Sequence, residues 1–284
     1  MLFCITMDIR RALLWGEEDL QYLKNPKLEA EVLLVGVLKK DRVFLKTNPA
    51  FPLSWGERRL YKKCIRKRLE GFPVAQILKC KDWAGFRIIV NKHVLIPRDE
   101  TEILCKEICE RQRTSSVKRI LDVGTGSGII AIFLKHHFPE AMVQALDFSS
   151  RALNVARKNA KKHQPAIEFL RSNLLDKIEA NEQYDIIVAN LPYVPENISI
   201  TPEVAKEPRK AIFSGADGLD LLRVFAEQLK EKNIQFRELW LEFLPQQEKS
   251  VEHIFKSWNV KFIQDAGGEV RFACVTERNV KGQM

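Results

Sequence analysis

The sequence predicts an α/β protein, with a doubly wound, mostly parallel sheet and a small N-terminal helical domain that a β-hairpin linker joins to it. Three observations lead to this fold class. From Arg119 onward, apolar runs of strand length alternate with helical runs, as they do in βαβ units. Between Asp8 and Phe72, apolar residues recur at helical spacing without strand-like alternation. The 284 residues, 45% hydrophobic and 29% charged, exceed the usual size of one domain and can support a core.

The helical domain is predicted over residues 1–75. Its last helix, residues 54–70, carries an apolar stripe on one face and ends at Gly71 and Pro73. The other face is basic and could dock a nucleoprotein, but we favour the simpler interpretation of a solvated face. The basic residues of this face are Arg58, Arg59, Lys62, Lys63, Arg66 and Lys67.

The linker is predicted over residues 76–97, where GFRIIV and HVLIP flank Asn91 and Lys92 as the strands of a hairpin. The catalytic-sized domain follows over residues 98–284. Its closing runs, KFIQDAG and EVRFACVTE, have no helix between them, so the sheet is expected to end in an antiparallel pair.

Composition narrows the class of protein and its compartment. The net charge of +9 suits an anionic partner such as RNA or a ribonucleoprotein, although many basic enzymes have none. The opening MLFCITM is too short for a secretion signal, and no run is long enough to span a bilayer. Met7 is an alternative start that the sequence leaves open. We therefore expect a cytoplasmic protein with reduced thiols, because no pair has CxxC or zinc spacing among Cys4, Cys64, Cys80, Cys105, Cys109 and Cys274.

The first predicted strand ends in a glycine turn, LDVGTGSG, that opens directly into a helix. Its G-x-G-x-G spacing differs from the G-x-G-x-x-G of dinucleotide sites. Asp122 precedes it, and its charge would repel a pyrophosphate but suits an ammonium and a sulfonium. Asp147, at the end of the next strand, can accept hydrogen bonds from both hydroxyls of a ribose. The turn favours S-adenosylmethionine over a nicotinamide or flavin dinucleotide, and over a purely structural role.

The stretch YDIIVANLPY is predicted to be a buried strand followed by a turn that directs its polar groups at a ligand. Asn190 falls at the carboxyl end of the strand, where open α/β sheets bind ligands, and Pro192 holds Leu191 extended. The Asn190 side-chain oxygen and the Leu191 carbonyl could accept both hydrogens of a planar NH2 group, with Tyr193 stacked on its flat face. This arrangement is typical of methyl transfer to an amide or exocyclic nitrogen.

Together the motifs resemble the HemK/PrmC family, the release factor glutamine methyltransferases. Asn-Leu-Pro-Tyr is similar to the Asn-Pro-Pro-Tyr signature of methyltransferases that act on planar nitrogens. The resemblance covers nearly the whole chain: the leucine-rich N-terminal helices, VLIPRDETE, LDVGTGSG, NLPYV, EPRKAIFSGADGLD, LEF with Glu242, and the closing Asp265, Gly268 and Arg271.

The resemblance implies a Rossmann-like class I methyltransferase fold and a set of site residues. Asp147 would hold the ribose of S-adenosylmethionine, and Asn173 and Leu174 would bracket its adenine. The methionine end would lie on the glycine turn, Gly124, Thr125, Gly126, Ser127 and Gly128. The substrate amide would be held by the catalytic set Asn190, Leu191, Pro192 and Tyr193, with Asn190 also beside the donor.

Three positions depart from the family pattern. Leu191 and Asp99 each replace a proline, and Asn173 replaces an acid that accepts from the adenine amino group. The backbone carbonyl of residue 191 is retained, and the Asn173 amide oxygen can still accept, although more weakly.

The resemblance implies transfer of a methyl group to N5 of the glutamine in the Gly-Gly-Gln loop of peptide chain release factors. The helical domain would dock this protein substrate, and no direct nucleic-acid binding, membrane contact or metal is expected. Alternatives are a ribosomal-protein glutamine, an exocyclic amine of DNA or RNA, and a donor-binding regulator without catalysis.

Overall fold

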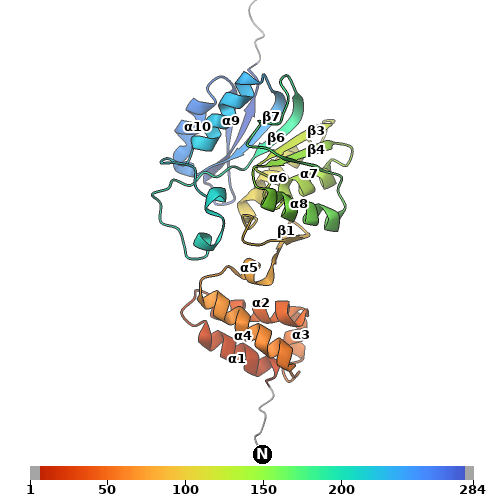
Figure 1. The fold of residues 1–284 in the computed structure, drawn as a ribbon, viewed down its shortest axis with the longest axis vertical. Helices are drawn as coiled ribbons and strands as arrows, with labels where there is room; N and C mark the ends of the chain where they lie inside the picture. Colours follow the sequence, from red (N-terminus) through yellow and green to blue (C-terminus); the bar gives the residue numbers. More distant parts are fainter. Residues whose placement is uncertain (1–6, 279–284) are drawn as a thin grey trace, which may run out of the picture. The chain divides into compact units, whose positions relative to one another are not determined.

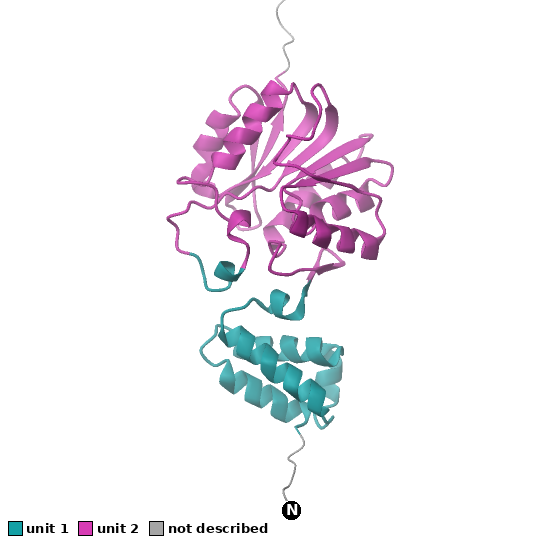
Figure 2. Cartoon of the chain, in the orientation of Figure 1, with its two compact units in different colours: residues 1–80, 200–206 teal, residues 81–199, 207–284 magenta. Residues whose placement is uncertain are grey.

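The structure, a computed structural model, describes residues 7–278. The chain forms two units (Figure 2). One contains the residues up to Cys80 together with Ile200–Lys206, and the other contains Lys81–Ser199 and the residues from Glu207 onward. Most of the opening MLFCITM, with Cys4, lies outside the described residues. Within residues 7–278, no helix has the length and apolarity to cross a bilayer, and no group of His, Cys, Asp and Glu side chains is arranged to hold a metal ion.

The first unit is helical, as predicted (Figure 1). Ser54 and Glu57 form a capping box at its longest helix, which explains why that helix begins where it does. Tyr61 of this helix is fully buried, and its hydroxyl donates to the carbonyl of Ala30 at 3.2 Å. A single apolar core holds the helices together. They are α1 (Ile9–Asp19), α2 (Pro26–Leu38), α3 (Arg42–Thr47), α4 (Trp55–Leu69) and α5 (Val74–Leu78).

A distant stretch of chain, Ile200–Lys206, belongs to this helical unit. Arg68 of α4 is buried and makes ion pairs with Glu29 and with Glu203, the latter at 2.8 Å. Gln76 donates to the carbonyl of Lys206 at 3.2 Å. No local sequence pattern indicated this attachment, since the partners lie more than 100 residues apart in the chain.

The linker hairpin is present and GFRIIV contains one of its strands, but its other strand and its turn were predicted wrongly. Its strands are β1 (Cys80–Trp83) and β2 (Phe86–Ile89), joined at Ala84 and Gly85, which both have positive φ. Two positive φ angles are what a tight two-residue hairpin turn requires. Asn91 instead starts a separate turn, in which its side chain accepts from the N–H of His93 at 2.9 Å. The run HVLIP is therefore not a strand.

The second unit has a sheet of seven strands in the order β5-β4-β3-β6-β7-β9-β8. The pairs from β5 to β7 are parallel, whereas β9 runs antiparallel to both β7 and β8, which confirms the predicted closing pair. The strands are β3 (Arg119–Val123), β4 (Met142–Asp147), β5 (Glu168–Arg171), β6 (Gln183–Ala189), β7 (Gln235–Glu242), β8 (Asn259–Gln264) and β9 (Val270–Thr276).

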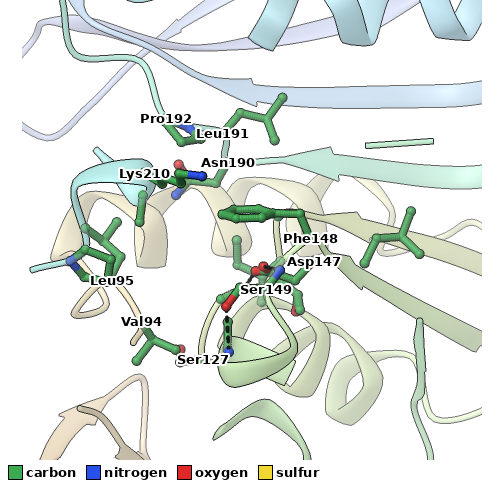
Figure 3. Close-up of a pocket in the computed structure, with 18 of the residues that line it drawn as sticks. Val94, Leu95, Ser127, Asp147, Phe148, Ser149, Asn190, Leu191, Pro192 and Lys210 are labelled. Carbon is green, nitrogen blue, oxygen red and sulfur yellow. Dashed lines mark hydrogen bonds between the residues drawn. The ribbon is translucent and has the colours of Figure 1, made fainter. Parts of the chain in front are cut away.

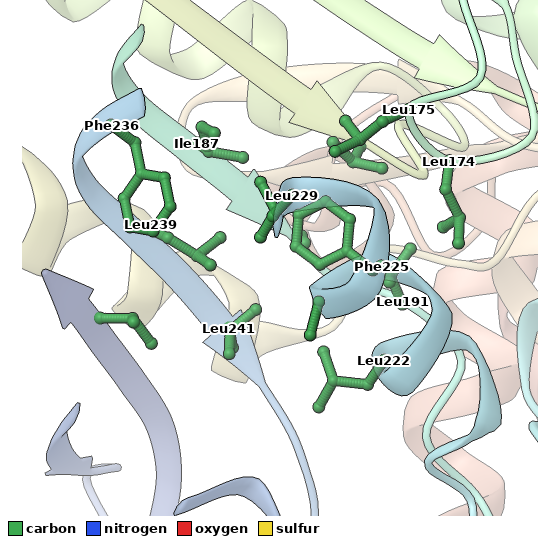
Figure 4. Packing of buried hydrophobic residues seen from close by; sticks show 14 of the residues in the cluster. Leu174, Leu175, Ile187, Leu191, Leu222, Phe225, Leu229, Phe236, Leu239 and Leu241 are labelled. Carbon is green, nitrogen blue, oxygen red and sulfur yellow. The ribbon is translucent and has the colours of Figure 1, made fainter. Parts of the chain in front are cut away.

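Helices cover both faces of this sheet (Figure 1), as in the predicted doubly wound fold. One face carries α6 (Asp99–Arg111), α7 (Ile129–His137) and α8 (Ser150–His163), and the other carries α9 (Asp220–Glu231) and α10 (Glu248–Ile254). Figure 4 shows Leu222, Phe225 and Leu229 of α9 packed toward strands β6 and β7. Short 3-10 turns occupy Val204–Lys206, Arg209–Ala211 and Pro245–Gln247.

The order of strands reverses between β3 and β6, and this reversal places the functional turns together. Val123 pairs with Leu146 of β4 on one side and with Ala189 of β6 on the other. Each of these residues ends its strand or stands next to the end. The segments that begin at Gly124, Asp147 and Asn190 therefore emerge side by side, at the point where open α/β sheets bind ligands.

Candidate active site

A pocket opens at the carboxyl ends of β3, β4 and β6, entirely within the second unit (Figure 3). Most of the site residues expected from the sequence line it, whereas Gly128 and Tyr193 do not. Those that line it are Gly124, Thr125, Gly126, Ser127, Asp147, Asn173, Leu174, Asn190, Leu191 and Pro192.

The glycine turn curls tightly under the pocket. Gly124 has φ +78°, and a Cβ there would lie 3.1 Å from Cδ2 of Leu191, so a larger residue would press on the neighbouring turn. Gly128 begins α7, also with positive φ, and its missing Cβ makes room for Ala156 of α8, which would lie 3.0 Å away. Gly128 thus packs the helices rather than lining the pocket.

Asp147 is fixed by the backbone around it. Its two carboxylate oxygens accept from the N–H of Ser149 at 2.8 Å and of Gly126 at 3.0 Å. Burial raises the pKa of this carboxyl, and the two N–H donors oppose that shift. Each oxygen keeps acceptor capacity beyond its backbone bond, so the group can take hydroxyl donors from a ribose.

Asp122 lies beneath the turn and is completely buried. Its Oδ2 accepts from the Thr125 hydroxyl at 2.6 Å and the Ala131 N–H at 3.2 Å, but its Oδ1 has no hydrogen-bond partner. Burial is the largest cause that raises the pKa of Asp122 to about 7. An unpaired, buried carboxylate oxygen under the turn favours a cationic ligand above it. Together with the open glycine cradle and Asp147, these residues fit S-adenosylmethionine.

The far wall of the pocket combines a strained turn with an exposed ring. Leu174 has φ +48°, a left-handed conformation that is uncommon for a leucine and that turns the chain beside Asn173. Phe148, which follows Asp147, is 47% exposed, and the Lys210 ammonium lies 5.8 Å from its ring centroid. Figure 3 shows this ring between Asp147 and Asn190. A flat adenine could stack on it.

Asn190 is held from behind by a buried carboxylate. Its amide nitrogen donates to Oε2 of Glu242 at 2.8 Å and to the Thr101 hydroxyl oxygen at 3.2 Å, and the Thr101 hydroxyl donates to the same Oε2 at 3.0 Å. The sheet explains this proximity, because Ala189 pairs with Leu241 and the next residues face each other. With its nitrogen committed, Asn190 has its side-chain oxygen available to a ligand.

Two residues of the Asn-Leu-Pro-Tyr turn have contacts that the sequence did not predict. The Tyr193 hydroxyl donates to Oε1 of Glu242 at 2.8 Å, behind the pocket, instead of the ring lining the pocket for stacking. Leu191 is 6% exposed and joins the apolar core near Leu174 and Phe225 (Figure 4). The leucine that replaces the family's proline is therefore anchored by packing.

Residues 95–98, the LIPR segment, are hydrogen-bonded to Glu207 on another side of the pocket. Glu207 is buried and accepts from the Ile96 N–H at 2.7 Å and from the Arg98 guanidinium at 2.6 Å. Asp99, which replaces a proline of the family pattern, begins α6 and pairs with Lys81 at 2.9 Å. An acid suits this first turn because of the helix dipole.

Several lining residues were not singled out in the sequence. Phe148 could have been found from its place directly after Asp147, whereas His93 and Lys210 come from loops whose course the pattern does not fix. Burial, with Arg151 and Lys92 nearby, lowers the pKa of His93 and so favours its neutral imidazole. Glu242 and Thr101 were noted only as parts of family motifs.

Family models match parts of both units. Residues 11–78 match the family described as PrmC N-terminal domain, and residues 99–234 match the Methyltransferase small domain. The release factor glutamine methyltransferase of Koribacter versatilis is 36% identical over 86% of this chain and 89% of its own length. The enzyme of the same name from Dictyoglomus turgidum is 35% identical over 89% of this chain and 92% of its own length.

Solved structures share the fold at lower identity. The catalytic domain of hMettl16 in complex with a 3′UTR hairpin superposes with a TM-score of 0.53 and 17% identity, covering 74% of this chain and 83% of that one. A 16S rRNA methyltransferase of T. Thermophilus in complex with AdoMet and guanosine gives 0.51 and 17%, covering 70% and 50%. These similarities establish the methyltransferase fold of the second unit.

Proposed function

Because the chain belongs to the release factor glutamine methyltransferase family, we propose that it transfers a methyl group from S-adenosylmethionine to the N5 amide nitrogen of a release factor glutamine. The family's enzymes depend on this donor, and the glutamine of the Gly-Gly-Gln loop is the proposed acceptor. With a release factor as its substrate, the proposed reaction would take place in the cytoplasm and would need no contact with nucleic acid.

The single observation that carries the proposal is the fixed amide of Asn190. Its nitrogen is bonded to Glu242 and Thr101, so its oxygen is the atom left for a ligand in the pocket. The carbonyl of Leu191, next in the chain, supplies a second acceptor. Two acceptors side by side match the two hydrogens of a carboxamide NH2 group.

The donor would lie between the glycine turn and Asp147. Gly124, Gly126 and Thr125 would carry its methionine end, Asp147 its ribose, and Asn173 with Phe148 its adenine. Bound S-adenosylmethionine supplies a methyl group made electrophilic by its sulfonium.

The residues of this chain would act by positioning. An amide nitrogen is a weak nucleophile because its lone pair is delocalised into the carbonyl. With both N–H hydrogens directed to Asn190 and Leu191, the nitrogen lone pair can be turned toward the methyl group at contact distance. The methylated nitrogen gives up one proton readily, so no strong base is needed in the pocket.

A labelling experiment tests the substrate class. The purified protein is incubated with radiolabelled S-adenosylmethionine and, in separate reactions, with release factors, ribosomal proteins or nucleic acid. Label on a release factor, mapped to the glutamine by mass spectrometry, is expected. Label confined to ribosomal protein or nucleic acid rejects the proposed substrate, and donor binding without any label indicates a regulator.

The Asn190→Ala variant tests the positioning role. We expect turnover to fall by about a hundredfold or more while the affinity for S-adenosylmethionine stays within about tenfold, since only alignment of the substrate is lost. Steady-state kinetics and donor titration measure the two quantities. Asn154→Ala, at an exposed position of α8, is the matched control. Normal turnover of Asn190→Ala would contradict the assigned role.

A further inference from the structure

The carboxylate of Glu242 gathers three donors behind the substrate side of the pocket. It is 4% exposed and accepts from the Asn190 amide at 2.8 Å, the Thr101 hydroxyl at 3.0 Å and the Tyr193 hydroxyl at 2.8 Å. Asn190 and Tyr193 are the two ends of the Asn-Leu-Pro-Tyr turn. One side chain from β7 therefore holds both ends of a turn that follows β6.

A carboxylate in this place decides which way the Asn190 amide faces. Burial raises the pKa of Glu242, but the hydrogen bonds from Tyr193 and Thr101 lower it and favour the ionised form. Ionised carboxylate oxygens only accept hydrogen bonds, so the amide directs its NH2 group at Glu242. The reversed amide would bring its carbonyl oxygen to about the same 2.8 Å from a buried carboxylate oxygen, with no hydrogen between them. Two acceptor oxygens in contact, with no donor between them, are costly where water is excluded. The reversed orientation is thus disfavoured before any substrate arrives.

The Thr101 hydroxyl strengthens the same choice. It accepts from the Asn190 amide at 3.2 Å and donates to Glu242, so each of its two roles is already assigned. If the amide reversed, the Thr101 hydroxyl would no longer accept a hydrogen bond from Asn190. Its single hydrogen would then face two acceptors, Glu242 and the Asn190 oxygen. The network has one fully satisfied arrangement.

We propose that Glu242 is a positioning residue that fixes the Asn190 amide with its oxygen toward the substrate, and so makes the pocket selective for a carboxamide over a carboxylate. This inference rests on the proposed function. A glutamine side chain offers two N–H hydrogens to the oxygen of Asn190 and the carbonyl of Leu191. A glutamate side chain offers none, and its charge would face two acceptors.

The Glu242→Gln variant changes the network with little change in shape. A glutamine at this position has an NH2 group that can donate to the oxygen of Asn190, so both orientations of the Asn190 amide become possible. We expect kcat with the release factor to fall on the order of a hundredfold, with donor affinity within about twofold. Glu238→Gln, on the same strand but bonded to Trp240, should keep wild-type kcat.

A double-mutant cycle separates positioning from general stability. If Glu242 acts through Asn190, then adding Glu242→Gln to Asn190→Ala should lower kcat by less than about threefold further. Full kcat in the single Glu242→Gln variant, or losses that multiply in the double variant, would overturn the proposal. Thermal unfolding of each variant identifies any that fail to fold. In that case Thr101→Val, which removes one partner of Asn190, should reduce kcat, and Thr101→Ser should restore it.

A measurement without turnover keeps the two proposals distinguishable. In the nitrogen-15 spectrum of the full chain, the side-chain amide of Asn190 should exchange slowly with solvent, because its nitrogen is bonded to both Glu242 and Thr101. Rapid exchange in the wild type would overturn the positioning role of Glu242. Slow exchange that is lost in Glu242→Gln, with no methylation of any release factor, would leave Glu242 as the positioning residue and reject the proposed function.

Discussion

Among single residues, Asp122 makes the stability of the protein depend on pH. Burial raises its pKa to about 7 in the folded chain, above an unfolded value of about 3.9. Between these values the folded state binds more protons than the unfolded state. The free energy of unfolding therefore falls as the pH rises through this window.

The Asp122→Asn variant should lose this dependence, because an amide does not ionise. Relative to the wild type, we expect its free energy of unfolding to improve by about 3 kcal/mol between pH 5 and pH 8, as one pKa unit corresponds to about 1.4 kcal/mol. Urea unfolding at the two pH values measures the difference, with Asp82→Asn at an exposed carboxyl as the control. An unchanged difference would show that Asp122 is not the source.

The sequence predicted the place of the glycine turn and of Asp147 in the pocket lining better than that of Tyr193. The glycine turn follows β3 and Asp147 ends β4, so their positions depend only on local pattern and strand ends. Tyr193 was expected to stack on substrate, yet its hydroxyl reaches Glu242, 49 residues away in the chain. A hydrogen bond between residues so far apart in the chain depends on which strands pair in the sheet. A single sequence does not show this pairing.

At the scale of elements, α4 holds the distant segment Ile200–Lys206. Arg68 is buried between Glu29 and Glu203, and the Lys206 ammonium lies 4.8 Å from the centroid of the Phe72 ring. The same segment leads directly into Glu207, which fixes the LIPR wall of the pocket. The contacts with α4 and Phe72 thus anchor Ile200–Lys206 to the helical unit.

The Arg68→Met variant should release the segment while keeping the volume of the side chain. We expect the backbone amides of Ala205 and Lys206 to exchange at least about tenfold faster, since their turn loses its anchor. Hydrogen-exchange mass spectrometry measures this rate. Arg66→Met, at an exposed site two residues earlier on the helix, is the matched control, and equal protection in both variants would contradict the role of Arg68.

The boundaries of helices and strands were predictable where the hydrophobic periodicity is strong. They were not predictable where the backbone conformation of a turn sets the end of a strand. The alternation after Arg119 indicated the strands and helices of the sheet, and the antiparallel closing pair was confirmed. The turn and one strand of the hairpin were predicted wrongly. Ala84 and Gly85 form the turn, whereas Asn91 and Lys92 have the more usual turn composition. The attachment of Ile200–Lys206 depends on the ion pair of Arg68 with Glu203, 135 positions apart, which no local pattern reveals.

For the whole molecule, the net charge of +9 is partly gathered on one surface of the helical unit. The exposed face of α4 forms a shallow groove, and the Arg59 guanidinium lies 5.4 Å from the centroid of the Trp55 ring. Charges of this kind attract anionic surfaces without fixing a partner. The groove residues are Trp55, Arg58, Arg59, Lys62, Lys63 and Arg66.

A comparison of substrates tests whether regions beyond the pocket bind the release factor. A short peptide that contains Gly-Gly-Gln would supply the substrate glutamine but little surface for the helical unit to bind. We expect its kcat/KM to be at least about tenfold lower than that of the whole release factor, because remote binding energy is absent. Equal values would contradict the docking role. Changing Lys62, Lys63 and Arg66 to glutamine should leave both values unchanged if the face is only solvated.

The bare α-carbon of Gly124 has a consequence for how such an enzyme can change over generations. A methyl group added there would come within 3.1 Å of Leu191 and 3.5 Å of the Asn190 carbonyl oxygen. The glycine turn and the Asn-Leu-Pro-Tyr turn are therefore nearly in contact here, and a side chain at residue 124 would require the Leu191 side chain to shift. Lineages that enlarge residue 124 should carry a compensating reduction at 191, and the two positions should drift as a pair.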